Sequence, residues 1–175
     1  KITIARGSAN VLGALGARDA VMYFLELKVG HRPAPWNLRH AVQGMRESFY
    51  RFDQLKTQKK AAAHALRAVT LAVHGGPVTL QAQAALREAT ATADGVDLAR
   101  TLGNLPPNIC TPSYMADEAR KLARQYKLRL EVLERRDMER LGMGALLAVT
   151  RGSHQPPKLI VLRYAGGAKK ARPIL

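Results

Sequence analysis

The chain has 175 residues, 47% of them hydrophobic, which is enough for one domain of ordinary size or for parts of two. Lys and Arg outnumber Asp and Glu by 28 to 13, a formal net charge of +15, and no acidic residue occurs between Asp53 and Glu88 or after Glu139. Residues 1–17 do not resemble a signal peptide and no apolar run approaches membrane-spanning length, which argues against a secreted or membrane-embedded protein; we expect a cytoplasmic one. A single cysteine, Cys110, rules out an intramolecular disulfide.

The first part of the chain predicts helices that alternate with strands. Residues 7–17 have the composition of a short helix, and residues 20–27 form an apolar run of strand length that we expect to be buried. Helical periodicity then extends over residues 36–55 and predicts a helix that covers one face of the sheet. Its expected inward positions are Leu38, Val42, Met45, Phe49 and Phe52.

The middle of the chain predicts a second strand at residues 68–73, so the organisation to this point is α/β. Residues 79–102 contain no proline and one glycine, Gly95, and predict a long alanine-rich helix that is weakened or kinked near that glycine. Gly103 suits the left-handed position just past a helix end, and the two prolines that follow shortly after it forbid continuation.

The last part of the chain predicts a second α/β unit. Thr111 has the character of an N-cap, with proline at the first helical position, and its helix is expected to reach Tyr126. A half-exposed strand at residues 128–133, a short helix at 136–141 and a buried strand at 158–164 follow. The expected inward positions of the first helix are Met115, Ala119, Leu122 and Ala123, and Gly142 is expected to end the short helix.

The turn after the long helix carries the most specific motif, N-L-P-P-N-I-C-T-P at residues 104–112. F-D-Q-L-K-T at residues 52–57 precedes it, and L-G-M-G-A-L-L-A-V at 141–149 and P-P-K-L-I at 156–160 follow it. The shorter motifs are common individually, but their order and spacing are specific. Together they resemble the leucyl aminopeptidase, or cytosol aminopeptidase, family, most strongly its bacterial aminopeptidase A type.

The resemblance implies an α/β fold with parts of two α/β domains joined by a long helix. Residues 1–76 resemble the C-terminal part of the family's accessory N-terminal domain, residues 77–102 its interdomain linker helix, and residues 103–175 the beginning of its catalytic domain. That domain is an α/β/α sandwich around a mixed sheet. Because Lys1 is not an initiator methionine and the chain ends where the family's metal-binding segment is expected to begin, we interpret it as a fragment.

Family members are hexamers that use two divalent cations, manganese or zinc, to release N-terminal residues such as leucine from peptides. Such chemistry needs several carboxylates that converge on both ions, but the 13 acidic residues here are mostly scattered along predicted helices beside Lys or Arg. By the resemblance, the ligands and catalytic side chains are expected after Leu175. We therefore assign no catalytic, metal-binding or cofactor-binding role to any residue, and expect the chain alone to be inactive.

Other candidate sites are weaker. His64 and His74 flank a predicted strand, and neither lies near a second ligand in the sequence, so surface or satisfied histidines are favoured over a zinc site. Cys110 lies just before a predicted helix start, a setting that can lower a thiol pKa. A packed small side chain is nevertheless favoured over a nucleophile, because no histidine partner is identifiable.

The basic charge leaves a DNA-binding accessory or regulatory role as an alternative function. The first candidates for phosphate contacts are Lys56, Lys59, Lys60, Lys169, Lys170 and Arg172. A basic face that is solvated, or paired with the remainder of the protein, is favoured over nucleic-acid binding. A third reading is an interaction module that oligomerises, because a sheet cut after Leu175 would expose strand edges.

Overall fold

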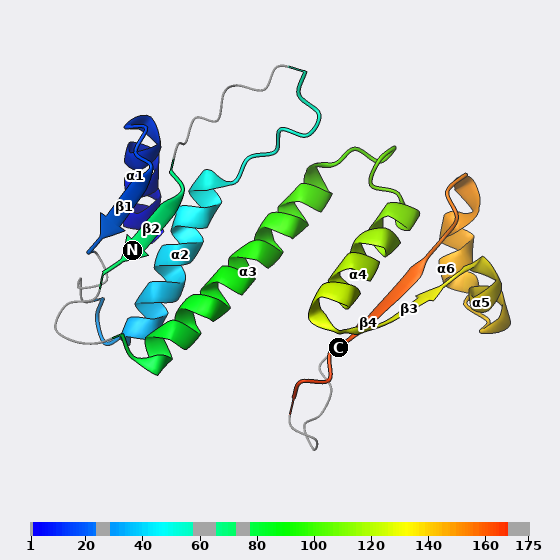
Figure 1. Ribbon diagram of the computed structural model, residues 1–175. Helices are drawn as coiled ribbons and strands as arrows, with labels where there is room; N and C mark the ends of the chain where they lie inside the picture. Colours follow the sequence, from blue (N-terminus) through cyan, green and yellow to red (C-terminus); the bar gives the residue numbers. More distant parts are fainter. Residues whose placement is uncertain (1, 24–28, 58–65, 73–77, 168–175) are drawn as a thin grey trace. The chain divides into compact units, whose positions relative to one another are not determined.

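The computed structural model describes residues 2–23, 29–57, 66–72 and 78–167, and the chain divides into two compact units, Lys1–Asn104 (unit 1) and Leu105–Leu175 (unit 2). Within the described ranges, each unit combines helices with a two-stranded sheet (Figure 1). The predicted α/β class is therefore confirmed.

The described part of unit 1 consists of two parallel strands and three helices. β1 (Asp19–Met22) pairs with β2 (Ala68–Leu71). Parallel strands need a crossover, and α2 (Ala34–Phe49) lies within it. α1 (Ile2–Ala14) packs against one side of α2 and α3 (Leu80–Asn104) against the other (Figure 1).

The core of unit 1 lies between the sheet and the helices. Ala5 and Ala9 of α1, Met22 of β1 and Met45 of α2 form its most buried part. Partly buried apolar side chains complete it, namely Leu12, Phe49, Val69 and Leu71. The predicted role of α2 as the cover of one sheet face is therefore confirmed, although this helix ends at Phe49, before residue 55.

The close approach of α1 to α2 depends on Gly44. A Cβ atom at this position would lie 3.0 Å from the carbonyl oxygen of Ile2 and 3.1 Å from the Cβ of Ala5. Few Cβ atoms in proteins have contacts this short. A side chain at this position would force its neighbours to move, and core packing leaves little room for such a movement. A glycine therefore lets the two helix backbones come together where α1 begins.

The contact between α2 and α3 combines small and branched side chains. Ala85, Ala89 and Ala93 recur every fourth residue on α3 and are all at least 95% buried. On α2, Leu38, Ala41 and Val42 are buried. α3 remains helical at Gly95 and at Gly103. The left-handed conformation predicted for Gly103 is therefore wrong. Its assignment to an interdomain linker stays a prediction.

Unit 2 begins with α4 (Pro112–Tyr126), which packs on an antiparallel pair formed by β3 (Arg129–Leu133) and β4 (Leu159–Arg163). The register runs from Arg129 opposite Arg163 to Leu133 opposite Leu159. Between the strands lie three short helical elements, α5 (Arg135–Arg140), α6 (Gly144–Val149) and the 3-10 helix η2 (Thr150–Gly152).

Local caps define the helix boundaries of unit 2. The hydroxyl of Thr111 accepts a hydrogen bond from the backbone N–H of Tyr114 at 3.2 Å, which confirms the predicted N-cap. α4 ends at Tyr126, and its C-cap, Lys127, is left-handed with φ of 53°. Gly142, with φ of 69°, follows α5 and confirms the second predicted helix end.

Two expectations for unit 2 are wrong. Met115 is 37% exposed because Ala116 and Ala119 face inward, and neighbouring helix positions point about 100° apart. β4 is half-buried rather than buried, with Leu162 40% exposed. Residues 144–149, the second part of the motif at 141–149, form the short helix α6.

Candidate functional site

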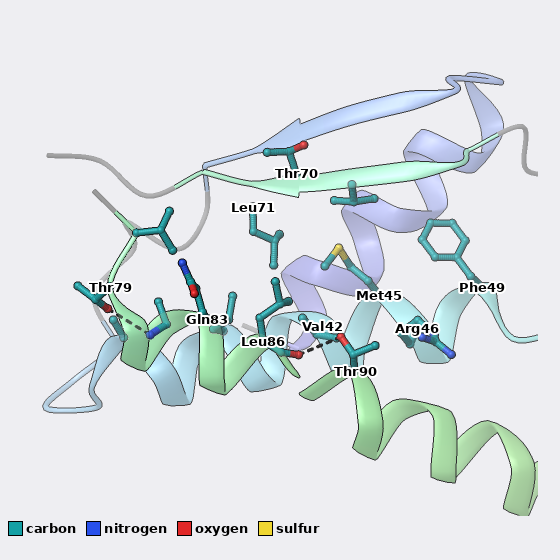
Figure 2. A pocket seen from close by; sticks show the side chains of 15 residues that line it. Val42, Met45, Arg46, Phe49, Thr70, Leu71, Thr79, Gln83, Leu86 and Thr90 are labelled. Carbon is teal, nitrogen blue, oxygen red and sulfur yellow. Dashed lines mark hydrogen bonds between the residues drawn. The ribbon is translucent and has the colours of Figure 1, made fainter. Parts of the chain in front are cut away.

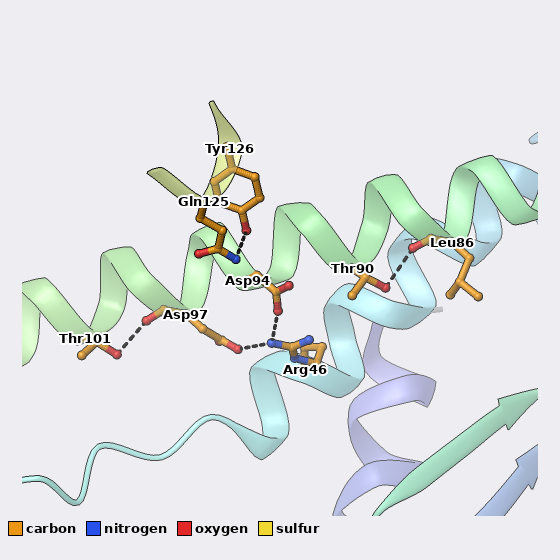
Figure 3. Close-up of polar contacts among 8 residues, drawn as sticks. All are labelled: Arg46, Leu86, Thr90, Asp94, Asp97, Thr101, Gln125 and Tyr126. Carbon is orange, nitrogen blue, oxygen red and sulfur yellow. Dashed lines mark hydrogen bonds and ion pairs between the residues drawn. The ribbon is translucent and has the colours of Figure 1, made fainter. Parts of the chain in front are cut away.

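The densest group of polar contacts between helices lies along the second half of the α2–α3 contact, which we call the polar seam. The Arg46 guanidinium of α2 donates to Asp94 at 2.6 Å and to Asp97 at 2.8 Å, both on α3 (Figure 3). The side chain of Asp97 is 24% exposed and that of Asp94 is 53% exposed, so the Asp97 pair is the better protected. Hydrogen bonding to Asp97 raises the pKa of Arg46, which fixes its positive charge.

Tyr50, at the C-cap of α2, continues the polar seam. The Thr101 hydroxyl donates to the Asp97 carbonyl at 2.8 Å, so it accepts from the Tyr50 hydroxyl at 3.1 Å. Asn104 in turn donates to the Tyr50 hydroxyl at 3.2 Å. The guanidinium of Arg100 lies over the Tyr50 ring, 3.9 Å from its centroid, in a cation–π contact.

Glu47 connects α2 to α1. Its carboxylate accepts from Arg6 of α1 and, at 3.1 Å, from Gln43 one turn earlier. The hydrogen bond from Arg6 lowers the pKa of Glu47, and so does the positive charge of Arg100 nearby. A hollow of about 410 Å³ lies beside this pair. Its lining is Arg6, Asn10, Glu47, Ser48, Val96 and Arg100.

A larger, mainly apolar groove of about 610 Å³ lies between β2, α2 and the start of α3 (Figure 2). Arg46 is the one charged side chain among its lining residues. Two of its hydroxyls form hydrogen bonds with the backbone of α3: Thr79 accepts from the N–H of Ala82 at 3.1 Å, and Thr90 donates to the Leu86 carbonyl at 2.9 Å. The groove therefore offers apolar surface and no acid–base pair.

The proline-rich motif forms a compact turn at the start of unit 2. The backbone N–H groups of Ile109 and Cys110 both donate to the Pro106 carbonyl at 2.9 Å. Cys110 is a free, half-buried cysteine. The turn thus leads directly into the Thr111 cap of α4.

Few of the candidate residues from the sequence lie in the described ranges. Lys56 does, and it pairs with Asp53 at 2.6 Å. The other five basic candidates and the two candidate histidines lie outside the described residues, namely Lys59, Lys60, Lys169, Lys170, Arg172, His64 and His74.

The donor side chains of the described residues do not converge on a point. Within those ranges, no group of three or more His, Cys, Asp and Glu side chains is placed to hold a metal ion. None of the helices described is both long and apolar enough for a membrane crossing. Most of the acidic residues in these ranges instead pair with arginine or lysine, as at the polar seam and in the local pair of Asp137 with Arg140.

Two sequence profiles match the chain in order. The profile for the N-terminal domain of the cytosol aminopeptidase family matches residues 3–59, and the profile for the catalytic domain of the same family matches residues 97–175. The chain belongs to the cytosol aminopeptidase family. The resemblance carried by the motif at residues 104–112 is thereby confirmed.

Curated relatives of this family member are named "Probable cytosol aminopeptidase". The protein of Nitrosospira multiformis is 47% identical over 173 residues, covering 97% of this chain and 33% of the relative. That of Dechloromonas aromatica is 44% identical over 170 residues, covering 97% of this chain and 34% of the relative. The chain thus spans about a third of the length of these relatives.

Solved structures show the same fold. The bottromycin maturation enzyme BotP in complex with Mn superposes with a TM-score of 0.78 at 29% identity, covering 93% of this chain and 32% of that chain. A mutant of tomato leucine aminopeptidase superposes with a TM-score of 0.74 at 24% identity, covering 91% and 32%. The second likeness supports the fold alone.

The polar seam was not predicted from the sequence. Arg46 and its two partners are separated by 48 and 51 positions, and Tyr50 and Asn104 by 54. The one available signal was the spacing of Asp94 and Asp97, which places both carboxylates on one side of a helix. That spacing does not identify the helix that supplies the arginine.

Proposed function

We propose that the protein containing this chain is a metal-dependent aminopeptidase that releases N-terminal residues, preferentially leucine, from peptides in intracellular protein turnover. The observation that carries this proposal is the order of the two family profiles, N-terminal domain then catalytic domain, on one chain. The names of relatives at 44% and 47% identity support the same activity.

The proposed cofactors are two divalent ions, manganese or zinc. The manganese in the BotP complex supports a metal requirement in a related protein. The described residues do not fit such a site, because they contain no converging group of carboxylate, histidine or cysteine ligands. We therefore propose that both ions bind to residues beyond those described, after Leu175, and we assign this chain a scaffold role.

We also propose a cytoplasmic homo-hexamer. This assembly is what the family resemblance implies. Light scattering coupled to size-exclusion chromatography of the complete protein measures the subunit number directly, and a stable monomer would overturn this part of the proposal.

The test of the activity compares two proteins, the product of the complete reading frame and residues 1–175 alone. The complete protein is expected to hydrolyse leucine p-nitroanilide after incubation with Mn²⁺ or Zn²⁺ and to lose the activity on chelation. Residues 1–175 are expected to be inactive in both conditions. Activity of the complete protein that survives chelation would contradict the metal requirement, and an absence of hydrolysis with any N-terminal residue would contradict the peptidase.

The DNA-binding alternative rests on the net charge of +15 and on the clusters of basic residues at positions 56–60 and 169–172. Lys56, the one candidate in the described ranges, is already paired with Asp53. A gel-shift titration of the complete protein with duplex DNA at low salt tests it, because phosphate contacts release counterions and weaken steeply with added salt.

A further inference from the structure

The polar seam joins residues from both family segments. Arg46 and Tyr50 lie in the N-terminal match, residues 3–59, whereas Asp97 lies in the catalytic match, residues 97–175. We infer that the polar seam is a latch, through which the N-terminal domain holds the last two turns of α3, where the catalytic-domain segment begins. The latch residues in the two matched segments are Arg46, Tyr50, Asp97, Arg100, Thr101 and Asn104. Asp94, one turn before Asp97, is the second carboxylate that Arg46 binds and belongs to the latch as well. This inference does not depend on the reaction that the protein catalyses.

The two halves of α3 are held in different ways. All of its buried residues, Ala85, Ala89 and Ala93, precede the latch. From Asp94 to Asn104 the described helix has exposed or half-buried side chains, and its contacts with α2 include two ion pairs, a cation–π contact and hydroxyl hydrogen bonds. A segment with few buried apolar contacts opens at low free-energy cost, so these polar contacts decide whether the end of α3 stays on α2.

Arg46 has two effects in the latch. It attracts Asp94 and Asp97, and it also neutralises two carboxylates that lie three positions apart on α3 (Figure 3). Like charges at this spacing repel each other when the intervening cation is removed. Loss of the arginine is therefore expected to loosen α3 more than loss of either carboxylate.

A second arginine on α2 supplies a matched control. Arg39 pairs with Glu88 of α3, so it has the same residue type, the same helix and the same partner helix as Arg46. Glu88 lies outside both matched segments and in the half of α3 that carries the buried alanines. Removal of Arg39 is expected to leave the end of α3 unchanged.

The experiment is hydrogen–deuterium exchange of the complete protein, read in peptides that cover residues 97–104. We expect Arg46→Leu to speed exchange there about three- to tenfold, the equivalent of losing one or two partly exposed ion pairs, whereas Arg39→Leu leaves it unchanged. In the unsubstituted protein, raising NaCl from about 50 mM to about 500 mM is expected to speed hydrogen exchange in the same peptides, because salt screens partly exposed charges.

Equal acceleration by both arginine variants, or none by either, would overturn the latch. If Arg46→Leu also speeds exchange in α1, the Asp97→Asn variant tests the latch instead. It removes one partner of Arg46 and leaves no charge at position 97 to repel Asp94. That variant is expected to speed exchange at residues 97–104 by a smaller factor and to reduce the salt response. Unchanged exchange and an unchanged salt response in Asp97→Asn would sink the proposal.

Discussion

The contacts that stabilise unit 1 internally differ in sequence range from those that fix the helix ends of unit 2. In unit 1, Gly44 admits the start of α1, and Arg46 reaches α3 across 48 and 51 positions. In unit 2, helix ends are fixed by neighbours in sequence, as Thr111 caps Tyr114 and Asp137 accepts from the backbone N–H of Glu134 at 3.1 Å. A single substitution in unit 1 should therefore disturb two elements at once, whereas one at a cap of unit 2 should disturb one helix end.

The largest expected effect tests whether unit 2 depends on more than caps. Met138 of α5 is fully buried and is the largest side chain of that kind in the described ranges. Met138→Ala should destabilise unit 2 by about 3 kcal/mol, because it removes buried methylene groups and leaves a cavity. Met115→Ala, at a 37% exposed methionine of the same unit, should cost less than about 1 kcal/mol.

The stability loss of both variants is measured by urea unfolding, with hydrogen exchange as the readout. Exchange in peptides from unit 2 is compared with exchange in peptides from unit 1. Equal losses from the two methionine variants would mean that the burial of Met138 does not anchor unit 2, and the contrast between the units would then rest on the caps alone.

The next effect breaks a long-range contact in unit 1. Gly44→Leu should destabilise the protein by about 2 kcal/mol, because even a Cβ would lie 3.0 Å from the Ile2 carbonyl oxygen and α1 must move away. Gly95→Leu is the matched control in α3: a Cβ there meets no atom within 4 Å. Since leucine is a better helix former, the control should be neutral or stabilising by up to about 1 kcal/mol.

Urea denaturation separates the two glycine variants by the sign of the change. Exchange in α1 and α2 should increase together in Gly44→Leu, since the two helices share the close contact. A Gly44→Leu protein as stable as Gly95→Leu would show that α1 does not need this approach.

A smaller effect is expected at a local cap. Thr111→Ala removes the acceptor for the Tyr114 N–H and should cost about 1 kcal/mol, with faster exchange in the first turn of α4. Thr111→Ser keeps the hydroxyl and should remain near the unsubstituted protein. Disturbance that spreads to β3 and β4 in the alanine variant would argue that unit 2 is as cooperative as unit 1.

The same difference in range explains what the sequence predicts well. Thr111 with the following proline, and Gly142 after α5, are signals within a few residues of the feature they determine, and both predictions are confirmed. The partners of Arg46 cannot be predicted from nearby residues, because a charge pattern on one helix does not reveal which distant helix faces it.

Gly103 illustrates how a distant contact changes a local outcome. A glycine near two prolines favours a left-handed helix end, but α3 continues to Asn104, whose side chain donates to Tyr50 at the C-cap of α2. Met115 illustrates the packing counterpart: it was predicted to face inward together with Ala119, and Ala119 is buried as expected. The small Ala116 is buried beside it in place of Met115, because small side chains permit closer packing.

The smallest expected effect uses pH to compare the units. The hydrogen bond from Arg6 lowers the pKa of Glu47 below the ordinary value of 4.5, so the ionised carboxylate stabilises folded unit 1. That contribution is complete above the unfolded pKa and is lost as pH falls through the lower folded pKa. Acid should therefore loosen the α1–α2 contact before it affects the caps at Thr111 and Gly142, which carry no titrating group.

Glu47→Gln tests this dependence. Its cost at pH 6 should be less than about 1 kcal/mol, because the Arg6 side chain is 53% exposed and water screens the pair. The variant and the unsubstituted protein should converge in stability as pH falls below 4.5, the ordinary value for this carboxyl. Arg6→Gln removes the other partner, and its stability should converge with that of the unsubstituted protein in the same way. Urea unfolding measured across this pH range checks both variants. A constant difference at all pH values would mean that Glu47 acts through packing, and that charge contributes nothing to the contact between α1 and α2.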